Sequence, residues 1–255
     1  MERVPVYIGM TTIPDRIRKG RTAKSIISLL ENIVRCEKIV LTIPDRTLKG
    51  EKYPDDILER YPYNHEDVII NRIDKDEGPI LKLMGLIDYM KKSGINAKNI
   101  MLADDDTVYA KNNIRHLWGL NKKFEGKSIG YAGRKWNRDR KTLVFQRYKT
   151  LIIKGIEIPF NVMDILESYH LVIHKTSLFM DKYEEWRDFV YKTMEECGDS
   201  RFTDDIIISL WCKKNNVSRI ICKGPKIRVI DNNTPKLSNQ NLKGRNDKVF
   251  LKLFG

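Results

Sequence analysis

Residues 100–107 read Ile-Met-Leu-Ala-Asp-Asp-Asp-Thr, an apolar run that ends in three consecutive carboxylates. Four apolar residues followed by a polar turn are typical of a short strand buried within a sheet. Adjacent like charges repel one another, so three neighbouring aspartates need a positive partner. In open α/β sheets, ligands bind at the carboxyl ends of the strands, and the aspartates stand at such an end. The stretch therefore predicts both a buried strand and the edge of the sheet where the functional site lies.

The residues before this stretch alternate between the patterns of strands and helices. Short aliphatic or β-branched runs predict strands at residues 4–10, 38–43 and 68–70. Apolar side chains three and four residues apart predict amphipathic helices at 23–34 and 80–90. Strands that alternate with helices of this length form a mostly parallel sheet covered by helices. The expected fold class is therefore α/β, with a Rossmann-like central sheet.

The second half of the chain is less regular, and no repeat or linker divides it from the first. Its expected elements are helices at 114–120, 183–196 and 204–214, and strands at 129–132, 143–158 (one or two strands), 169–174 and 219–222. We therefore expect a single domain over residues 1–255, with halves of about 4–110 and 111–230. A polar tail follows at 231–255 and is expected to end in a short helix at 247–254.

Composition limits the possible classes of protein. The 255 residues are 41% hydrophobic, which excludes wholesale disorder, and 47 Lys and Arg against 34 Asp and Glu leave a formal charge of +13. That charge favours a polyanionic partner, such as nucleic acid, an anionic membrane surface or a phosphorylated ligand. No run approaches the roughly 20 apolar residues of a membrane span, and the start of the chain does not resemble a signal peptide. The expected location is the cytoplasm.

The aspartate run itself has two interpretations. Alternate residues of an extended chain face the same way, so Asp104 and Asp106 can reach one hard divalent cation, Mn or Mg, or the phosphates bound to it. The alternative is a solvated acidic turn that caps the helix expected after Asn112. The position at the end of a buried strand favours the metal site.

Two other segments carry groups that suit an anionic ligand. The loop at residues 11–16, Thr-Thr-Ile-Pro-Asp-Arg, offers hydroxyls and a guanidinium to a nucleotide, although it also suits an ordinary turn before a helix. Lys82 lies one turn into the helix that follows Gly78 and Pro79, where the positive end of the helix favours a phosphate. The alternative for Lys82 is a solvated lysine on an amphipathic helix.

Together these segments resemble a known family. The Asp-x-Asp motif after an apolar strand, in a chain that opens with a β-α-β unit, resembles the nucleotide-sugar-dependent glycosyltransferases of the GT-A fold. Three further segments resemble a branch of that superfamily found in bacteria and large DNA viruses. These are residues 11–16, residues 76–82 (Asp-Glu-Gly-Pro-Ile-Leu-Lys) and residues 203–206 (Thr-Asp-Asp-Ile). The resemblance covers roughly residues 4–230.

The resemblance implies a set of donor ligands. Asp104 and Asp106 are expected to bind the metal. The residues expected to contact the nucleotide-sugar donor, of which a UDP-sugar is the first choice, are Thr11, Thr12, Pro14, Arg16, Lys82, Asp104 and Asp105.

The resemblance also implies a base and an acceptor site. Asp205 is the expected general base and Asp204 the close alternative, although an acidic residue at the start of the helix at 204–214 also caps it. Asp164 and Glu167 are the expected ligands of the acceptor, a glycan or glycoprotein. Ser168 departs from the family pattern, which often has a glycine near this position.

The function expected from the sequence is therefore a metal-dependent, inverting glycosyltransferase. A viral origin, which the Lys-, Ile- and Asn-rich composition fits, would place it in the host cytoplasm or the virion. A metal-dependent nucleotidyltransferase would use a similar sheet, but it usually carries a Gly-rich loop after the first strand, and residues 11–16 contain no glycine. A basic nucleic-acid-binding module would explain the net charge and the basic segment at 134–141, Arg-Lys-Trp-Asn-Arg-Asp-Arg-Lys. Such a module would leave the aspartates without a role. No nucleic-acid partner is expected.

Overall fold

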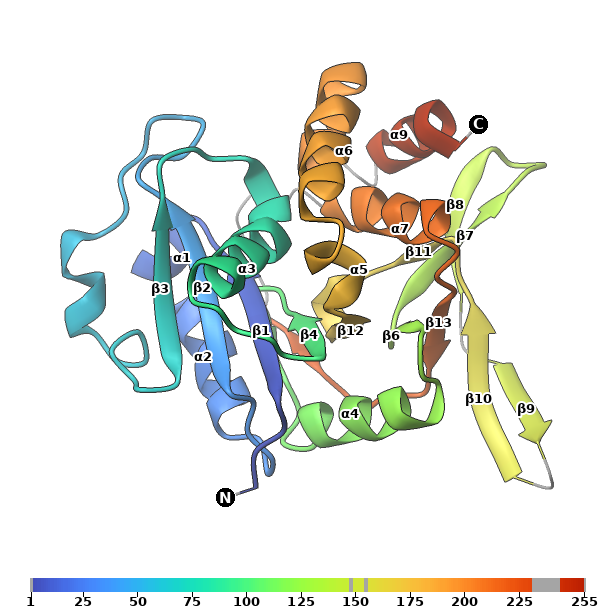
Figure 1. Cartoon of the computed structure of the whole chain (residues 1–255), viewed down its shortest axis with the longest axis horizontal. Helices are drawn as coiled ribbons and strands as arrows, with labels where there is room; N and C mark the ends of the chain where they lie inside the picture. The colour runs from blue at the N-terminus through green and yellow to red at the C-terminus, as the bar shows by residue number, and fades with distance from the viewer. Residues whose placement is uncertain (1, 147–148, 154–155, 231–243, 255) are drawn as a thin grey trace.

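The structure is a computed structural model that describes residues 2–146, 149–153, 156–230 and 244–254. Within these residues nine strands form the main sheet (Figure 1). In chain order they are β1 (Val6–Thr11), β2 (Lys38–Pro44), β3 (Val68–Ile73), β4 (Asn99–Leu102), β6 (Ser128–Gly130), β9 (Lys149–Ile153), β10 (Ile156–Val162), β12 (Val172–Lys175) and β13 (Arg219–Cys222). Their spatial order is β3-β2-β1-β4-β12-β6-β13-β10-β9.

The sheet is mostly parallel. Strands β3, β2, β1 and β4 run in one direction. Strand β12 is inserted antiparallel between β4 and β6, and β13 returns parallel to β6. Strands β10 and β9 add an antiparallel edge. The expected α/β class with a mostly parallel central sheet is therefore confirmed, and the sheet is compatible with a Rossmann-like fold. Each strand and helix predicted in the first hundred residues is present with somewhat shifted ends.

The strand order reverses in the parallel half of the sheet. The chain places β2 and then β3 on one side of β1, and it crosses to the other side of β1 to form β4. Because β1 and β4 are neighbouring parallel strands, the chain leaves both of them at the same edge of the sheet. Such a reversal of strand order is where open α/β sheets bind their ligands.

Helices cover both faces of the sheet (Figure 1). The α-helices are α1 (Pro14–Arg18), α2 (Arg21–Leu30), α3 (Leu81–Lys92), α4 (Asn113–Lys123), α5 (Ser177–Met180), α6 (Tyr183–Glu196), α7 (Asp204–Lys214) and α9 (Arg245–Phe254). Helices α2 and α4 bury Ile26 and Leu117 in one apolar cluster. Helices α3, α6 and α7 bury Leu86, Trp186 and Trp211 in a second cluster. Within the part of the chain that the structure describes, no helix has the length and apolarity needed to cross a bilayer.

Short elements complete the second half. These are the strands β5 (Thr107–Val108), β7 (Gly133–Asn137), β8 (Thr142–Phe145), β11 (Ile165–Leu166) and β14 (Arg228–Val229), and the 3-10 helices η1 (Asp55–Glu59), η2 (Gly78–Ile80), η3 (Ser168–His170) and η4 (Gly198–Phe202). Strands β11, β7 and β8 form a small antiparallel sheet. The basic segment at 134–141 therefore belongs mainly to the β7–β8 hairpin.

Two predictions for the second half need comment. The strand predicted at 169–174 is wrong in its first part, because residues 168–170 form η3 and the strand begins only at Val172. The backbone of Leu171 has a φ of 80°, which breaks the extended conformation at that point. The terminal helix predicted at 247–254 is confirmed as α9. Residues 231–243 of the predicted tail lie outside the described residues.

Two glycines let α3 lie unusually close to the sheet. A Cβ atom on Gly9 of β1 would lie 2.0 Å from the backbone oxygen of Lys82, and one on Gly85 of α3 would lie 2.3 Å from the side chain of Thr42 in β2. Neither position can accept a methyl group without movement of the neighbouring element. The close approach fixes the depth of the first turn of α3, from which Lys82 projects.

Replacing Gly85 by Ala should therefore destabilise the protein. Overpacking a well-packed core costs roughly 1–3 kcal/mol, which exceeds the roughly 1 kcal/mol that alanine gains over glycine inside a helix. Gly119→Ala in α4 is the matched control, because a Cβ atom there would meet no atom of another described element within 4 Å. Urea denaturation should show a lower unfolding free energy for Gly85→Ala and an equal or higher one for Gly119→Ala. Equal stability of both variants would contradict the close approach.

Candidate active site

The segments that leave β1 and β4 meet through a buried carboxylate. Asp105 is 4% exposed, and it accepts hydrogen bonds from the Thr12 hydroxyl and from the Arg16 guanidinium. The other terminal nitrogen of Arg16 lies 3.0 Å from Oδ2 of Asp106. Arg16 is thus a positive partner of the aspartate run, supplied by helix α1, which closely follows β1.

Further hydrogen bonds fix this junction. The hydroxyls of Thr12 and Thr22 lie 2.6 Å apart, and Tyr53 donates from its hydroxyl to the backbone oxygen of Thr12 at 2.7 Å. The side chain of Asp105 is therefore used within the protein, where it ties the two loops together. Thr11 and Pro14 point elsewhere: the Thr11 hydroxyl donates to the backbone of Thr42 at 2.8 Å, and Pro14 is buried at the start of α1.

Lys82 forms the second junction. It is 4% exposed, and its ammonium contacts Oδ1 of Asp104, Oδ2 of Asp204 at 2.9 Å and the hydroxyl of Ser168 at 2.6 Å. These partners come from the end of β4, the first turn of α7 and η3. One cation therefore joins three segments that lie far apart in the sequence.

Ser168 connects this junction to Asp205. Its hydroxyl lies 2.8 Å from Oδ1 of Asp205, and its backbone N–H donates to the same oxygen at 3.2 Å. The same hydroxyl lies 3.3 Å from Oδ1 of Asp104. The structure thus brings Lys82, Asp104, Asp204 and Asp205, all predicted as site residues, into one cluster with Ser168, which we call the Lys82 cluster.

The surrounding backbone holds the Lys82 cluster in place. Gly78 has a φ of 76°, and a Cβ atom there would lie 2.7 Å from the backbone oxygen of Arg201. This close approach brings η2, just before α3, against η4, just before α7. The hydroxyl of Tyr109 accepts from the backbone N–H of Asp104 at 2.8 Å and donates to its backbone oxygen at 3.0 Å. Gly78 therefore helps to position the helix that carries Lys82, and Tyr109 holds the backbone at Asp104.

Charge and burial lower the pKa of one carboxyl group of the site and raise the pKa of two others. Burial disfavours the ammonium of Lys82, but Asp104, Asp204 and Asp205 outweigh it, so the pKa of Lys82 lies well above its ordinary value. Burial acts to raise the pKa of Asp104, but the adjacent Lys82 lowers it below its ordinary value. Burial, and then the negative charge of Asp204, raises the pKa of Asp205 well above its usual range. Burial likewise raises the pKa of Asp106 to about 6, despite the nearby Arg16.

The predicted acceptor ligands, Asp164 and Glu167, flank β11 on its two sides. Oε1 of Glu167 accepts from Nε of Arg134 in β7 at 2.7 Å, and Oε2 of Glu167 is buried with no hydrogen-bond partner among the described residues. Oδ2 of Asp164 accepts from the backbone N–H of Trp136 at 2.9 Å. Glu167 directly precedes Ser168 of the Lys82 cluster, whereas Asp164 points into a separate pocket.

The sequence did not identify every functional group of the site. Ser168 and Tyr109 had no predicted role, because a lone serine or tyrosine carries no recognisable spacing pattern, and Arg134 was considered only as part of the basic segment at 134–141. The position of Ser168 beside two carboxylates and Lys82 depends on the η3 turn, which the sequence predicted as strand.

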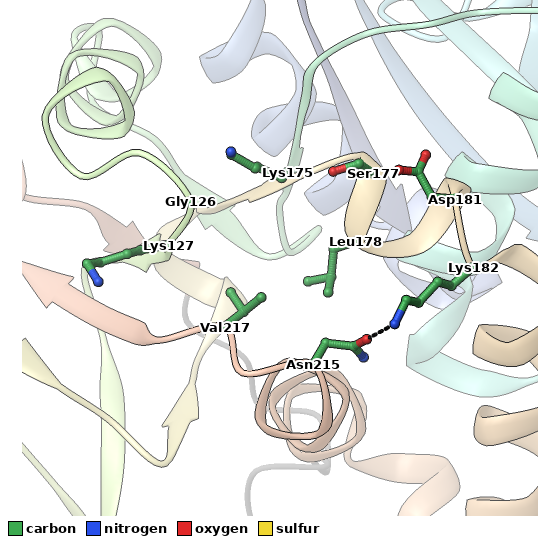
Figure 2. Close-up of a pocket in the computed structure, with 9 residues that line it drawn as sticks. All are labelled: Gly126, Lys127, Lys175, Ser177, Leu178, Asp181, Lys182, Asn215 and Val217. Carbon is green, nitrogen blue, oxygen red and sulfur yellow. Dashed lines mark hydrogen bonds between the residues drawn. The ribbon is translucent and has the colours of Figure 1, made fainter.

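Two hollows of the surface are lined by residues outside the Lys82 cluster. One, of about 260 Å³, is lined by Lys127, Lys175 and Lys182 among others (Figure 2). There Lys182 donates to Oδ1 of Asn215 at 2.8 Å. A larger one, of about 530 Å³, includes Asp164. Among the described residues, no three His, Cys, Asp or Glu side chains are grouped so that they could hold a metal ion by themselves.

The sequence comparisons add no family assignment. No protein-family model matches the chain, and no curated protein matches it.

Replacing Lys82 by Met should destabilise the protein strongly. Removing one partner of a buried ion pair costs roughly 3–5 kcal/mol, because the remaining charges stay buried and uncompensated. Lys92→Met, on an exposed position at the end of the same helix, is the matched control. Unfolding free energies from urea denaturation at pH 7 should fall for Lys82→Met only.

The pH dependence of this loss follows from the carboxylates. Without Lys82, the folded-state pKa of Asp104 should rise, and a raised carboxyl pKa favours the folded state at low pH and disfavours it at high pH. The difference in unfolding free energy between wild type and Lys82→Met should therefore shrink as the pH falls from 8 to 5. A difference that is absent, or constant over this range, would contradict the charge balance of the Lys82 cluster.

Proposed function

We propose that this chain is a metal-dependent glycosyltransferase of the GT-A type. It would move a sugar from a nucleotide-diphosphate sugar, a UDP-sugar first, to a hydroxyl of a glycan or glycoprotein. The observation that carries the proposal is the convergence of Arg16, Lys82, the aspartate run and Asp205 at the reversal of strand order. These groups combine basic side chains for phosphates with carboxylates for a cation and for a proton.

Asp104 and Asp106 fit a divalent cation by their hard carboxylate oxygens. In the ion pairs with Lys82 and Arg16 the contacting oxygens are Oδ1 of Asp104 and Oδ2 of Asp106. Magnesium at such sites is usually held by one or two carboxylates together with phosphate oxygens of the substrate, so a third protein ligand is not required. The bound Mn or Mg would neutralise negative charge that develops on the departing diphosphate. Arg16 and Lys82 would add positive charge beside the same phosphates.

Asp205 suits the role of general base better than Asp204. The carboxylate of Asp204 is buried and paired with Lys82, so it is already engaged within the protein. Asp205 is less buried, its pKa is raised, and Ser168 orients it through two hydrogen bonds. In the proposed step the acceptor oxygen forms a bond to the anomeric carbon while the bond to the diphosphate breaks, and Asp205 takes the hydroxyl proton. A single displacement of this kind inverts the configuration.

The two other function classes have less support. A nucleotidyltransferase could use the same carboxylates, but the loop between β1 and α1 has no glycine for close backbone contact with a triphosphate. A nucleic-acid module would give no role to the aspartate run or to the carboxylates around Lys82. One face of Trp136, the aromatic residue of the basic segment, is covered by Phe250, with ring centroids 4.8 Å apart.

The test of the function is hydrolysis of a panel of nucleotide sugars without acceptor. With Mn²⁺ present, chromatography should detect slow release of a nucleoside diphosphate from one or a few donors. Chelation of the metal, or the variant Asp106→Asn, should stop that release. Consumption of a nucleoside triphosphate with release of pyrophosphate would instead indicate a nucleotidyltransferase. The absence of both reactions would overturn the proposal.

A pair of variants tests the base. Once a donor and acceptor are known, Asp205→Asn should lower the transfer rate by roughly 10²–10⁴-fold, the usual contribution of general-base catalysis. Its unfolding free energy should change little, because asparagine has nearly the same shape and its amide oxygen can still accept the hydrogen bonds from Ser168. Asp204→Asn should lower stability instead, since it removes a partner of the buried Lys82. Retention of full transfer by Asp205→Asn would show that its carboxylate is not the base.

A further inference from the structure

The larger hollow has the chemistry of a small-molecule site. It lies between β7, α7 and α9, and its volume of about 530 Å³ falls in the range of ligand pockets. Three aromatic rings and three charged side chains line it. They are Trp136, Phe250, Phe254, Asp164, Arg138 and Lys213. We call this hollow the aromatic pocket.

The rings form a continuous stack. Trp136 and Phe250 lie 4.8 Å apart between centroids at an interplanar angle of 20°, and Phe250 and Phe254 lie 4.2 Å apart at 13°. Phe250 is buried in the middle of the stack, whereas Trp136 and Phe254 are partly exposed. The stack offers a rigid apolar wall whose shape is fixed before any ligand binds, so little conformational entropy is lost on binding.

Both hydrogen-bond acceptors and hydrogen-bond donors lie around this wall. The carboxylate of Asp164 is fixed by the backbone N–H of Trp136 at 2.9 Å, and it keeps acceptor capacity for further hydrogen bonds. Arg138 is exposed at the rim, and the ammonium of Lys213 lies 4.8 Å from the centroid of the Phe254 ring. An apolar wall with adjacent donors and acceptors suits a sugar ring, which has apolar C–H faces and hydroxyls that both donate and accept.

The aromatic pocket lies at the far end of the helix that carries the proposed base. Helix α7 begins with Asp204 and Asp205 and reaches Lys213 eight residues later, which places the two ends roughly 12 Å apart along the axis. On the other wall, Asp164 precedes Ser168 of the Lys82 cluster by four residues. The pocket and the cluster are therefore connected by two short, well-packed segments.

We propose that the aromatic pocket is a distal subsite for an oligosaccharide acceptor, which would bind a sugar unit remote from the reacting hydroxyl. This inference rests on the proposed function and deepens it, because it makes the acceptor a glycan chain rather than a monosaccharide or a protein side chain alone. Binding at a remote subsite would hold the acceptor so that its reacting end reaches Asp205.

Calorimetry of oligosaccharide binding without donor tests the subsite separately from catalysis. The probes are three hexasaccharides: cellohexaose, chitohexaose and a hyaluronan hexasaccharide. We expect at least one to bind wild type, and Phe254→Ala to weaken its binding about tenfold, the size expected for loss of one aromatic contact. Arg138→Ala is a second variant that should weaken the binding, and because Arg138 is exposed it should leave folding unchanged. Lys182→Ala, in the hollow of Figure 2 that is lined without aromatic rings, is the control and should bind like wild type.

The outcomes separate the two proposals. If a nucleotide sugar is hydrolysed but no hexasaccharide binds, or if Phe254→Ala and Arg138→Ala both bind like wild type, the subsite is wrong while the glycosyltransferase stands. If binding depends on both residues but no nucleotide sugar is hydrolysed, the pocket remains a carbohydrate site and the proposed function fails. With an active acceptor, the two variants should raise KM for oligosaccharides and leave kcat nearly unchanged.

Discussion

The arrangement of the site depends on one buried ammonium group. Lys82 contacts Asp104 and Asp204 directly and reaches Asp205 through Ser168, so carboxylates from β4 and α7 can lie close together despite their mutual repulsion. Arg16 does the same for Asp105 and Asp106. The acidic character of the site is therefore balanced by the protein's own cations, and the site is assembled as part of folding.

The fold supplies the positions from which these cations reach the carboxylates. The glycines in β1 and α3 bring the first turn of α3 onto the sheet, and Gly78 brings η2 against η4 just ahead of α7. The reversal of strand order places the exit of β1 beside the exit of β4. Four segments of the chain thus meet at one edge, where a ligand with phosphates would contact both basic and acidic side chains.

The sequence predicted the first half of the fold well, because its strands and helices have clear periods and alternate regularly. It also placed Arg16 and the aspartate run at one edge, since segments after parallel strands converge there, whereas the role of Asp205 came from the resemblance to a family. It did not predict that Arg16 and Lys82 pair with the aspartates, or that Ser168 joins them, because such contacts depend on the depth of α3 and on the η3 turn. Strand β8 falls largely within the strand region predicted at 143–158, but β7 escaped prediction, since it carries Arg134 and Lys135 and its Trp136 packs on Phe250 of α9, more than a hundred residues later.

The most direct measurement of the proposed donor site is a crystal structure of the chain with Mn²⁺ and UDP, with anomalous data for the metal. We expect a manganese peak at the carboxylates of Asp104 and Asp106, and diphosphate oxygens within hydrogen-bond distance of Lys82 or Arg16. Manganese and UDP bound together at another surface, with the ion pairs of Lys82 and Arg16 undisturbed, would contradict this placement of the donor.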